Sequence, residues 1–192
     1  EKPTLGVPEG PYLEQASDAG LTAFEASVED LAAAGYDIER VALFEEIGRI
    51  NDRHETLMAA EMALTHESWF EAHGDRYAEA TRELIEQGRE VPAASIARGL
   101  QGRNELREAV EARMDETGVD VWIAPAAPGP APEGLDDTGD PVMNLPWTHS
   151  GLPTVALPAG NVDGLPVGVQ CATRFGADED LLGWAEELAA AL

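Results

Sequence analysis

Basic residues are scarce in this sequence. The 192 residues contain 37 Asp and Glu against 12 Lys and Arg, which gives a formal net charge of −25, and Lys2 is the only lysine. A surface this acidic repels phosphate backbones, so we expect no binding of nucleic acid by this chain. Two explanations compete for the charge: adaptation to high salt, and a codon bias that replaces lysine by arginine. Arginine would have balanced the acids, so we favour salt adaptation.

Cysteine and long apolar runs are also nearly lacking. The single cysteine, Cys171, excludes an internal disulfide framework and is expected to be a small buried hydrophobe. No run of about 18 apolar residues is present, so we expect no membrane span. The first residues have neither the basic start nor the apolar stretch of a signal peptide, which favours a cytoplasmic protein; the missing initiator Met fits a processed or truncated start.

No metal or cofactor motif is apparent. His66-Glu67 begins like the zinc motif His-Glu-x-x-His, but Phe70 stands where the second histidine is needed. We therefore expect no metal site and no cofactor.

The first half of the chain alternates strand and helix patterns. Residues 5–7 predict a short strand, 17–34 a helix that Gly35 ends, and 36–44 a second strand. This order is typical of a βαβ unit, so the two strands should be parallel neighbours or near neighbours. Residues 45–88 are expected to be helical with a break near Gly74.

The next pattern is a helix over 90–116, then a buried strand over 119–124. The two helical stretches have apolar residues that we expect to face the core. These are Ile47, Ile50, Leu57, Met58, Met62, Trp69 and Phe70 in the first, and Ile96, Leu100, Leu106, Val110 and Met114 in the second.

The last third contains a long loop and a strand pair. Residues 125–141 are rich in Pro, Gly, Ala and Asp, and long loops of this kind are often functional. Two apolar runs, 153–157 and 166–172, flank a turn at 159–164 and predict paired strands. Val167, Val169 and Cys171 should share one side of the second strand, and Gly168 leaves the other side open to close approach. A helix over 178–192 closes the chain.

The residue pattern of this region resembles the amidase signature family. The resemblance rests on Asn144-x6-Gly151-Leu152-Pro153, Leu157-Pro158-Ala159-Gly160 and Gly164-Leu165-Pro166-Val167-Gly168-Val169-Gln170, with Asp120-Val121-Trp122-Ile123-Ala124-Pro125 upstream and the closing helix downstream. More weakly, Leu5-Gly6-Val7-Pro8 and the unit that follows it also fit. The match spans nearly the whole chain but only the second half of a family member.

The resemblance implies a fold and a site. The fold would be α/β: part of the family's α/β/α sandwich, a mixed β-sheet with helices on both faces, with residues 1–192 as one incomplete domain. The family's catalytic Lys and two Ser lie in its other half, in and around a Gly/Ser-rich segment, so no catalytic residue is assigned in this chain. By the same resemblance Asn144, Trp147, Thr148 and His149 are candidate substrate-pocket residues, although each could instead serve packing or loop structure.

Three functions remain open at this point. The first is hydrolysis of carbon–nitrogen (amide) bonds, with this chain supplying the C-terminal sheet and the wall of the substrate pocket. The second is the A-type subunit of a tRNA-dependent amidotransferase, which needs partner subunits. The third is a non-catalytic α/β binding module. The partners expected for the first are a small amide substrate, the missing N-terminal half and, through exposed sheet edges, a further copy of the chain.

Overall fold

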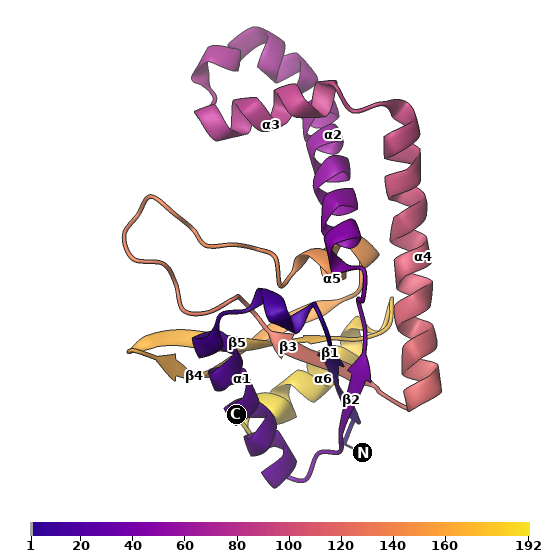
Figure 1. Cartoon of the computed structure of the whole chain (residues 1–192), viewed down its shortest axis with the longest axis vertical. Helices are drawn as coiled ribbons and strands as arrows, with labels where there is room; N and C mark the ends of the chain where they lie inside the picture. Colours follow the sequence, from indigo (N-terminus) through magenta and orange to yellow (C-terminus); the bar gives the residue numbers. More distant parts are fainter. Residues whose placement is uncertain (1) are drawn as a thin grey trace.

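A computed structural model describes residues 2–192 and places a five-stranded sheet between two groups of helices (Figure 1). The strands are β1 (Leu5–Glu9), β2 (Ile38–Ala42), β3 (Val121–Pro125), β4 (Thr154–Val162) and β5 (Leu165–Ala172). The helices are α1 (Asp18–Ala33), α2 (Ile47–His73), α3 (Glu79–Arg89), α4 (Ala93–Thr117), α5 (Leu145–Ser150) and α6 (Asp178–Ala189), with short 3-10 turns η1 (Leu13–Gln15) and η2 (Gly74–Arg76).

The sheet is mixed. Its strand order is β2-β1-β3-β5-β4. Strand β1 pairs in parallel with β2 and β3, whereas β5 runs antiparallel to both β3 and β4. The expected βαβ unit is therefore confirmed, with β1 and β2 as direct neighbours, and so is the α/β fold class. Within residues 2–192, no helix combines the length and apolarity needed to cross a bilayer.

Both faces of the sheet are buried, each beneath different helices. Helices α1 and α6 pack on one face, where β3 contributes Ile123 and β5 contributes Cys171. Helices α2, α4 and α5 pack on the other, where β3 contributes Trp122. Neighbouring residues of β3 thus serve two separate cores, because strand side chains alternate. Cys171 is 1% exposed, which confirms the expected small buried hydrophobe, and this burial raises the pKa of its thiol to about 12.

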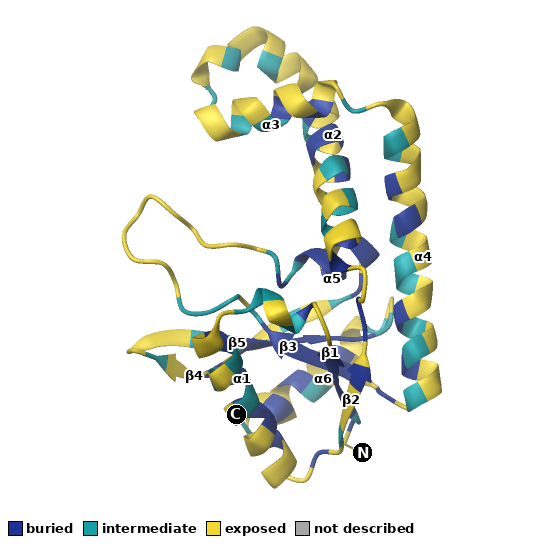
Figure 2. Ribbon diagram, in the orientation of Figure 1, coloured by how far each residue is buried: buried dark blue, intermediate teal, exposed yellow. Residues whose placement is uncertain are grey.

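Helices α2, α3 and α4 form an arm that extends away from the sheet (Figures 1 and 2). Helix α3 packs closely along α2 at Gly88, which has no side chain. A Cβ at this position would stand 1.9 Å from the carbonyl oxygen of Ala59. The expected apolar stripes were wrong for Met58, Trp69 and Leu100, which are 40%, 61% and 43% exposed. Helix α2 buries Leu57, Ala59, Ala60 and Ala63 instead, so helical periodicity alone overestimated the width of the buried face.

The segment before β4 and the hairpin itself differ from the expected elements. Residues 145–150, to which no element was assigned, form α5, which Gly151 ends with a φ of 69°. The expected turn at 159–164 is confirmed for Asp163 and Gly164 but wrong for residues 159–162, which continue β4. Both turn residues have positive φ, 51° and 84°, which is the conformation of a tight two-residue hairpin turn.

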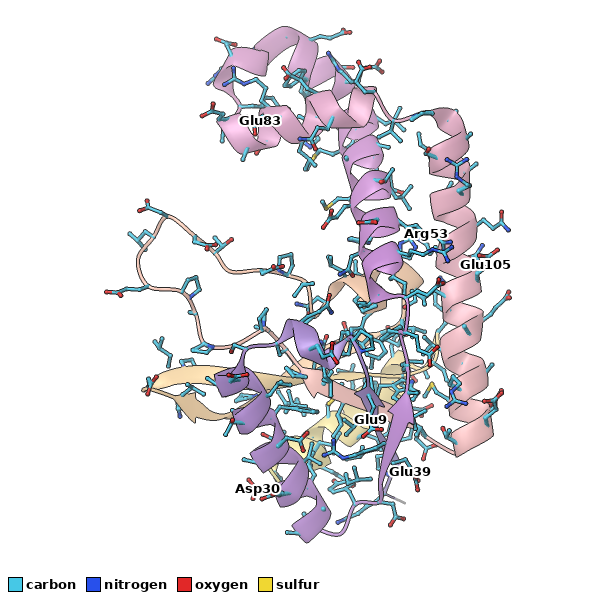
Figure 3. All side chains as sticks on the ribbon, in the orientation of Figure 1. Glu9, Asp30, Glu39, Arg53, Glu83 and Glu105 are labelled. Atoms are coloured by element: carbon cyan, nitrogen blue, oxygen red, sulfur yellow. The ribbon has the colours of Figure 1, made fainter. Side chains whose placement is uncertain are left out.

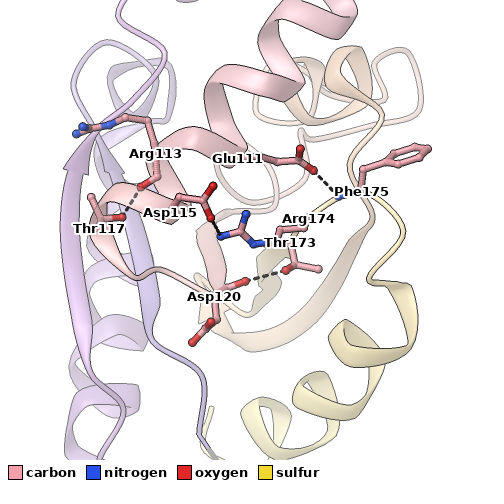
Figure 4. A network of polar contacts seen from close by, with 8 residues as sticks. All are labelled: Glu111, Arg113, Asp115, Thr117, Asp120, Thr173, Arg174 and Phe175. Atoms are coloured by element: carbon pink, nitrogen blue, oxygen red, sulfur yellow. Dashed lines mark hydrogen bonds and ion pairs between the residues drawn. The ribbon is translucent and has the colours of Figure 1, made fainter.

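The end of α4 is fastened to the segment that follows β5 (Figure 4). The guanidinium of Arg174 lies 2.8 Å from the carboxylate of Asp115. Close by, the Thr173 hydroxyl donates to the carbonyl oxygen of Asp120 at 2.7 Å. The first contact joins the base of the arm to the segment after β5, and the second joins that segment to the residue before β3.

We expect the melting temperature to climb as KCl is raised from low to molar concentration. Among residues 2–192 five ion pairs form, and the carboxylate of each is more than 40% exposed, so little of the acid excess is compensated locally. The remaining repulsion is long-ranged in dilute buffer and weakens as the Debye length falls from about 30 Å at 0.01 M to about 3 Å at 1 M. Thermal melts across a KCl series measure this; a flat or falling curve would leave the acid excess unexplained.

Candidate functional site

The long loop after β3 forms one side of a large cavity. The cavity has a volume of about 900 Å³ and lies between α1, the loop, Asn144 and the β4–β5 hairpin. In Figure 1 the loop arches outward beside α1 and the hairpin. Most of the lining is apolar, and Asp140 is the one charged residue among the described residues that line it.

Part of each of three segments that carry the family resemblance lines this cavity. Asn144, the Leu157-Pro158-Ala159 step of β4 and the Pro166-Val167-Gly168-Val169 step of β5 all line it. At Gly168 the neighbouring chain segments pack closely. A Cβ there would stand 3.0 Å from the carbonyl oxygen of Leu157 and 3.4 Å from Cβ of Ala126. The close approach expected at Gly168 is thus made by the chain's own backbone and loop.

Asn144 fixes the end of the loop at the cavity. Its side-chain Nδ2 donates to the carbonyl oxygen of Ala126 at 3.2 Å, and its backbone N–H donates to Pro141 at 2.7 Å. The residue therefore ties the start of the loop to its end. Of the four candidate substrate-pocket residues, Asn144 is the one that the structure brings to this cavity.

The other three candidates point elsewhere. Trp147 is 1% exposed and packs in the core, with its ring 4.9 Å from that of Phe44. Thr148 is exposed on α5, outside the cavity lining. His149 is 1% exposed and lines a different cavity, between α2 and α4. A direct contact of these three with substrate stays a prediction.

A buried polar network beneath the cavity holds the loop ends in place. The amide Nε2 of Gln170 donates to the carbonyl oxygens of Pro125 and Met143, each at 2.8 Å, and lies 3.1 Å from the Tyr12 hydroxyl. Tyr12 donates to Met143 at 2.8 Å and accepts from the Trp147 indole at 2.9 Å. Burial raises the pKa of Tyr12, so its hydroxyl stays protonated and acts as a structural donor.

Gln170 and Tyr12, the two ends of this network, differ in how well the sequence indicates their role. Gln170 belongs to the motif that carries the resemblance, and it could have been noted there as a polar residue on a buried strand. Tyr12 stands 158 residues before Gln170 and offers no local signal. Only the folded sheet brings the two together.

Two serines near the cavity and the single lysine make local structural contacts. Ser17 caps α1 by accepting from the Gly20 N–H at 3.1 Å, and it donates to Pro128 at 2.9 Å. Ser27 lines the cavity but donates to the carbonyl oxygen of Ala23, one turn back on α1. Lys2 lies over the ring of Tyr36, 4.4 Å from its centroid.

The histidines of α2 are likewise in structural contacts. The His66 ring nitrogen Nδ1 lies 2.8 Å from the Tyr77 hydroxyl. Among residues 2–192, no group of three or more His, Cys, Asp and Glu side chains is placed to hold a metal ion.

Comparison with known proteins shows the same relationship in sequence and in structure. The family model described as Amidase matches residues 3–182. The A-type subunit of a Glutamyl-tRNA(Gln) amidotransferase from Halobacterium salinarum is 28% identical over 204 aligned positions, covering 91% of this chain and 48% of the relative. The corresponding subunit from Pseudomonas fluorescens is 38% identical over 76 positions, covering 36% of this chain and 16% of the relative.

Two solved structures match along the full length of the chain. One, described as an amidase, superposes with a TM-score of 0.87 at 27% identity, and this chain covers 46% of it. A bacterial aryl acylamidase of the amidase signature enzymes superposes with a TM-score of 0.80 at 16% identity, which shows the shared fold, and 44% of it is covered. The chain thus spans about half the length of these proteins. With the family model matched over residues 3–182, this chain belongs to the Amidase family.

Proposed function

We propose that this chain acts in the hydrolysis of carbon–nitrogen amide bonds, as the C-terminal half of an amidase. It would supply the C-terminal part of the sheet and one wall of the substrate pocket. The observation that carries this proposal is the convergence of the family-resembling segments, Asn144, 157–159 and 166–169, on one cavity of about 900 Å³. A cavity of this size is in the range that takes a small organic substrate.

The lining suggests what this wall would do. Proline, alanine, leucine and valine side chains provide an apolar surface that would hold the hydrocarbon part of an amide and exclude water from the reacting bond. Asn144 is the polar group we propose for contact with the substrate. The nucleophile would come from the other half of the enzyme, which by family resemblance carries the lysine and serines that activate a hydroxyl for attack on the carbonyl.

The proposal is tested by turnover of a simple aryl amide. We expect no hydrolysis by residues 1–192 alone, and hydrolysis once the catalytic half is supplied on the same chain or as a fragment. Turnover by the 192 residues alone, together with labelling by a serine-reactive probe, would contradict this assignment of the chemistry to the other half.

A cavity variant tests the wall itself. In the active enzyme, Val167→Trp should fill part of the cavity and lower kcat/KM for a bulky aryl amide more than for a small aliphatic one. Leu182→Trp is the matched control, because Leu182 is 63% exposed on α6. Equal loss for both amides, or no change in either, would argue against this cavity as the substrate site.

A second candidate function is the A-type subunit of a tRNA-dependent amidotransferase. It is favoured by the relatives from Halobacterium salinarum and Pseudomonas fluorescens, which are both named as subunits of this type of a Glutamyl-tRNA(Gln) amidotransferase. Co-purification of further subunits and a preference for glutamine over aryl amides would favour this function over a free-standing amidase.

We also propose how the chain is assembled and where it acts. Strands β2 and β4 are the edges of the sheet, and such edges are ready to pair with another chain segment. The other half of the enzyme or a second copy would cover at least one of them. We place the protein in the cytoplasm, with an acidic surface adapted to salt.

A further inference from the structure

Four nitrogen-bearing side chains gather between three helices on the side of the sheet away from α1. Arg53 and His54 come from α2, Arg103 from α4 and His149 from α5. The rings of His54 and His149 lie 5.7 Å apart, edge to face. Figure 3 shows Arg53 extending into the space between α2 and α4. In a chain with 37 acids and 12 bases, this gathering is unlike the rest of the molecule.

Several of these nitrogen atoms are buried without a hydrogen-bond partner among residues 2–192. They are Nδ1 of His54, both ring nitrogens of His149 and Nε of Arg103. His149 is itself only 1% exposed. A buried polar atom that lacks a partner is costly, because it has lost its hydrogen bonds to water without replacing them. Arg103 is paired through Nη2 with Glu61 at 3.7 Å, so the unused hydrogen-bonding capacity is greatest at His149, where both ring nitrogens lack a partner among residues 2–192.

His149 and Arg53 line the same cavity, of about 560 Å³. Arg53 can lie across α4 because the facing residue is Gly102, where a Cβ would stand 2.9 Å from Nη1 of Arg53. Any larger residue at this point would push the guanidinium aside. The glycine is thus matched to the position of the arginine.

Among the three arginines of this lining, Arg53 is the one that forms no ion pair with residues 2–192. Arg49 pairs with Glu46 and Arg113 with Glu116, each at 2.6 Å. Arg53, by contrast, forms none of the five ion pairs found among residues 2–192. Its planar fork is suited to bind two oxygens of a carboxylate or phosphate at once.

The carboxylates that face the cavity limit what it can accept. Glu45, Glu46 and Glu105 line it, so a large or highly charged anion would be repelled. Glu46 is already paired with Arg49, and Glu105 accepts from the Gln101 amide at 2.6 Å. A single small oxyanion placed between Arg53 and His149 would meet the least repulsion.

The ring of His149 complements such a ligand without adding charge. Burial, with smaller effects from His54, Arg103 and Arg53, lowers the pKa of His149 to about 4. At neutral pH the ring is therefore uncharged and has one N–H to donate. The guanidinium of Arg53 would supply the positive charge, and the N–H of His149 would donate a hydrogen bond that orients the anion.

We propose that the cavity between α2, α4 and α5 is a binding site for a small oxyanion, a carboxylate or phosphate group, held by Arg53 and His149. This site lies apart from the cavity lined by Asn144 and does not depend on the amide-hydrolysis function. The amide substrate and the oxyanion would bind in separate cavities that share no lining residue.

The test is titration calorimetry of the purified protein with inorganic phosphate and with acetate, at an ionic strength held constant with KCl. We expect saturable binding of one equivalent of at least one of the two anions. Arg53→Gln should weaken it by about tenfold or more, because a charge-assisted fork is lost. Arg53→Lys, which keeps the charge without the fork, should bind with intermediate affinity.

The matched control is Arg82→Gln, which makes the same charge change at an exposed position on α3. It should bind like the unaltered protein. Phosphate binding without acetate binding would identify a phosphate site, and the reverse a carboxylate site. Equal weakening by Arg53→Gln and Arg82→Gln, or heats from both anions no larger than those from chloride, would overturn the proposal. Melting curves of each variant check that it is folded.

Discussion

Replacing Trp147 by alanine should destabilise the protein by about 3–5 kcal/mol. The side chain is 1% exposed, packs edge to face against Phe44 at 4.9 Å and Tyr12 at 6.0 Å, and donates its indole N–H to the Tyr12 hydroxyl. Alanine would leave a large cavity and remove one partner from a buried hydroxyl. Denaturant unfolding measures the loss as a lower midpoint with an unchanged slope.

The same chain offers a matched control in Trp69. This tryptophan is 61% exposed on the arm, so Trp69→Ala should change stability by no more than about 0.5 kcal/mol. A nearly unchanged midpoint for Trp147→Ala would contradict its place in the core. In the active enzyme, a changed ranking of bulky and small amides with the fold intact would instead make Trp147 a substrate contact.

Acidification from pH 6.5 to 4 should remove up to about 3 kcal/mol of stability through His149 alone. Burial, followed by the nearby His54, Arg103 and Arg53, lowers the pKa of His149 from 6.5 to about 4 in the folded protein. Between these two pH values His149 is protonated in the unfolded chain but not in the folded protein. The unfolded state is therefore favoured as the pH falls, and above pH 6.5 the contribution to stability is constant.

Carboxylates also titrate in this range, so the measurement is a difference between variants. The free energy of unfolding of the unaltered protein minus that of His149→Gln should fall as the pH is lowered from 6.5 to 4. His73→Gln, at an exposed position near the end of α2, is the matched control for the substitution itself. A pH-independent difference for His149→Gln would mean that its ring is protonated as easily in the folded as in the unfolded state.

The elements with strong local patterns could be predicted from sequence. The helix expected at 17–34 is α1, capped by Ser17, and the strand pair after Leu152 is the β4–β5 hairpin. Helix α5 was not predicted, because six residues are too few for a helical period to show. The end of this helix at Gly151 is recognised from the positive φ of that residue, which the structure shows.

The candidate site could be predicted only in part. Family resemblance gave Asn144 as a candidate substrate-pocket residue; the structure places it on the wall of the cavity of about 900 Å³, and its contact with substrate stays a prediction. The directions of the Trp147 and His149 side chains depend on their positions around helix α5. Because this helix was not predicted, the sequence did not indicate which side each residue faces. The contacts of Tyr12 with Gln170 and Met143 join residues more than 130 positions apart, and no local pattern encodes such pairings.

The hydrogen bonds of Gln170 determine which part of this fold can vary in sequence and length. One amide nitrogen holds the carbonyls of Pro125 and Met143, so the two ends of the intervening loop are fixed whatever the loop contains. Lengthening a closed loop is cheap, about 0.6 kcal/mol for each doubling. The loop can therefore be exchanged as a cassette, with new lengths and side chains over the cavity, while Asn144 and the sheet beneath it keep their positions.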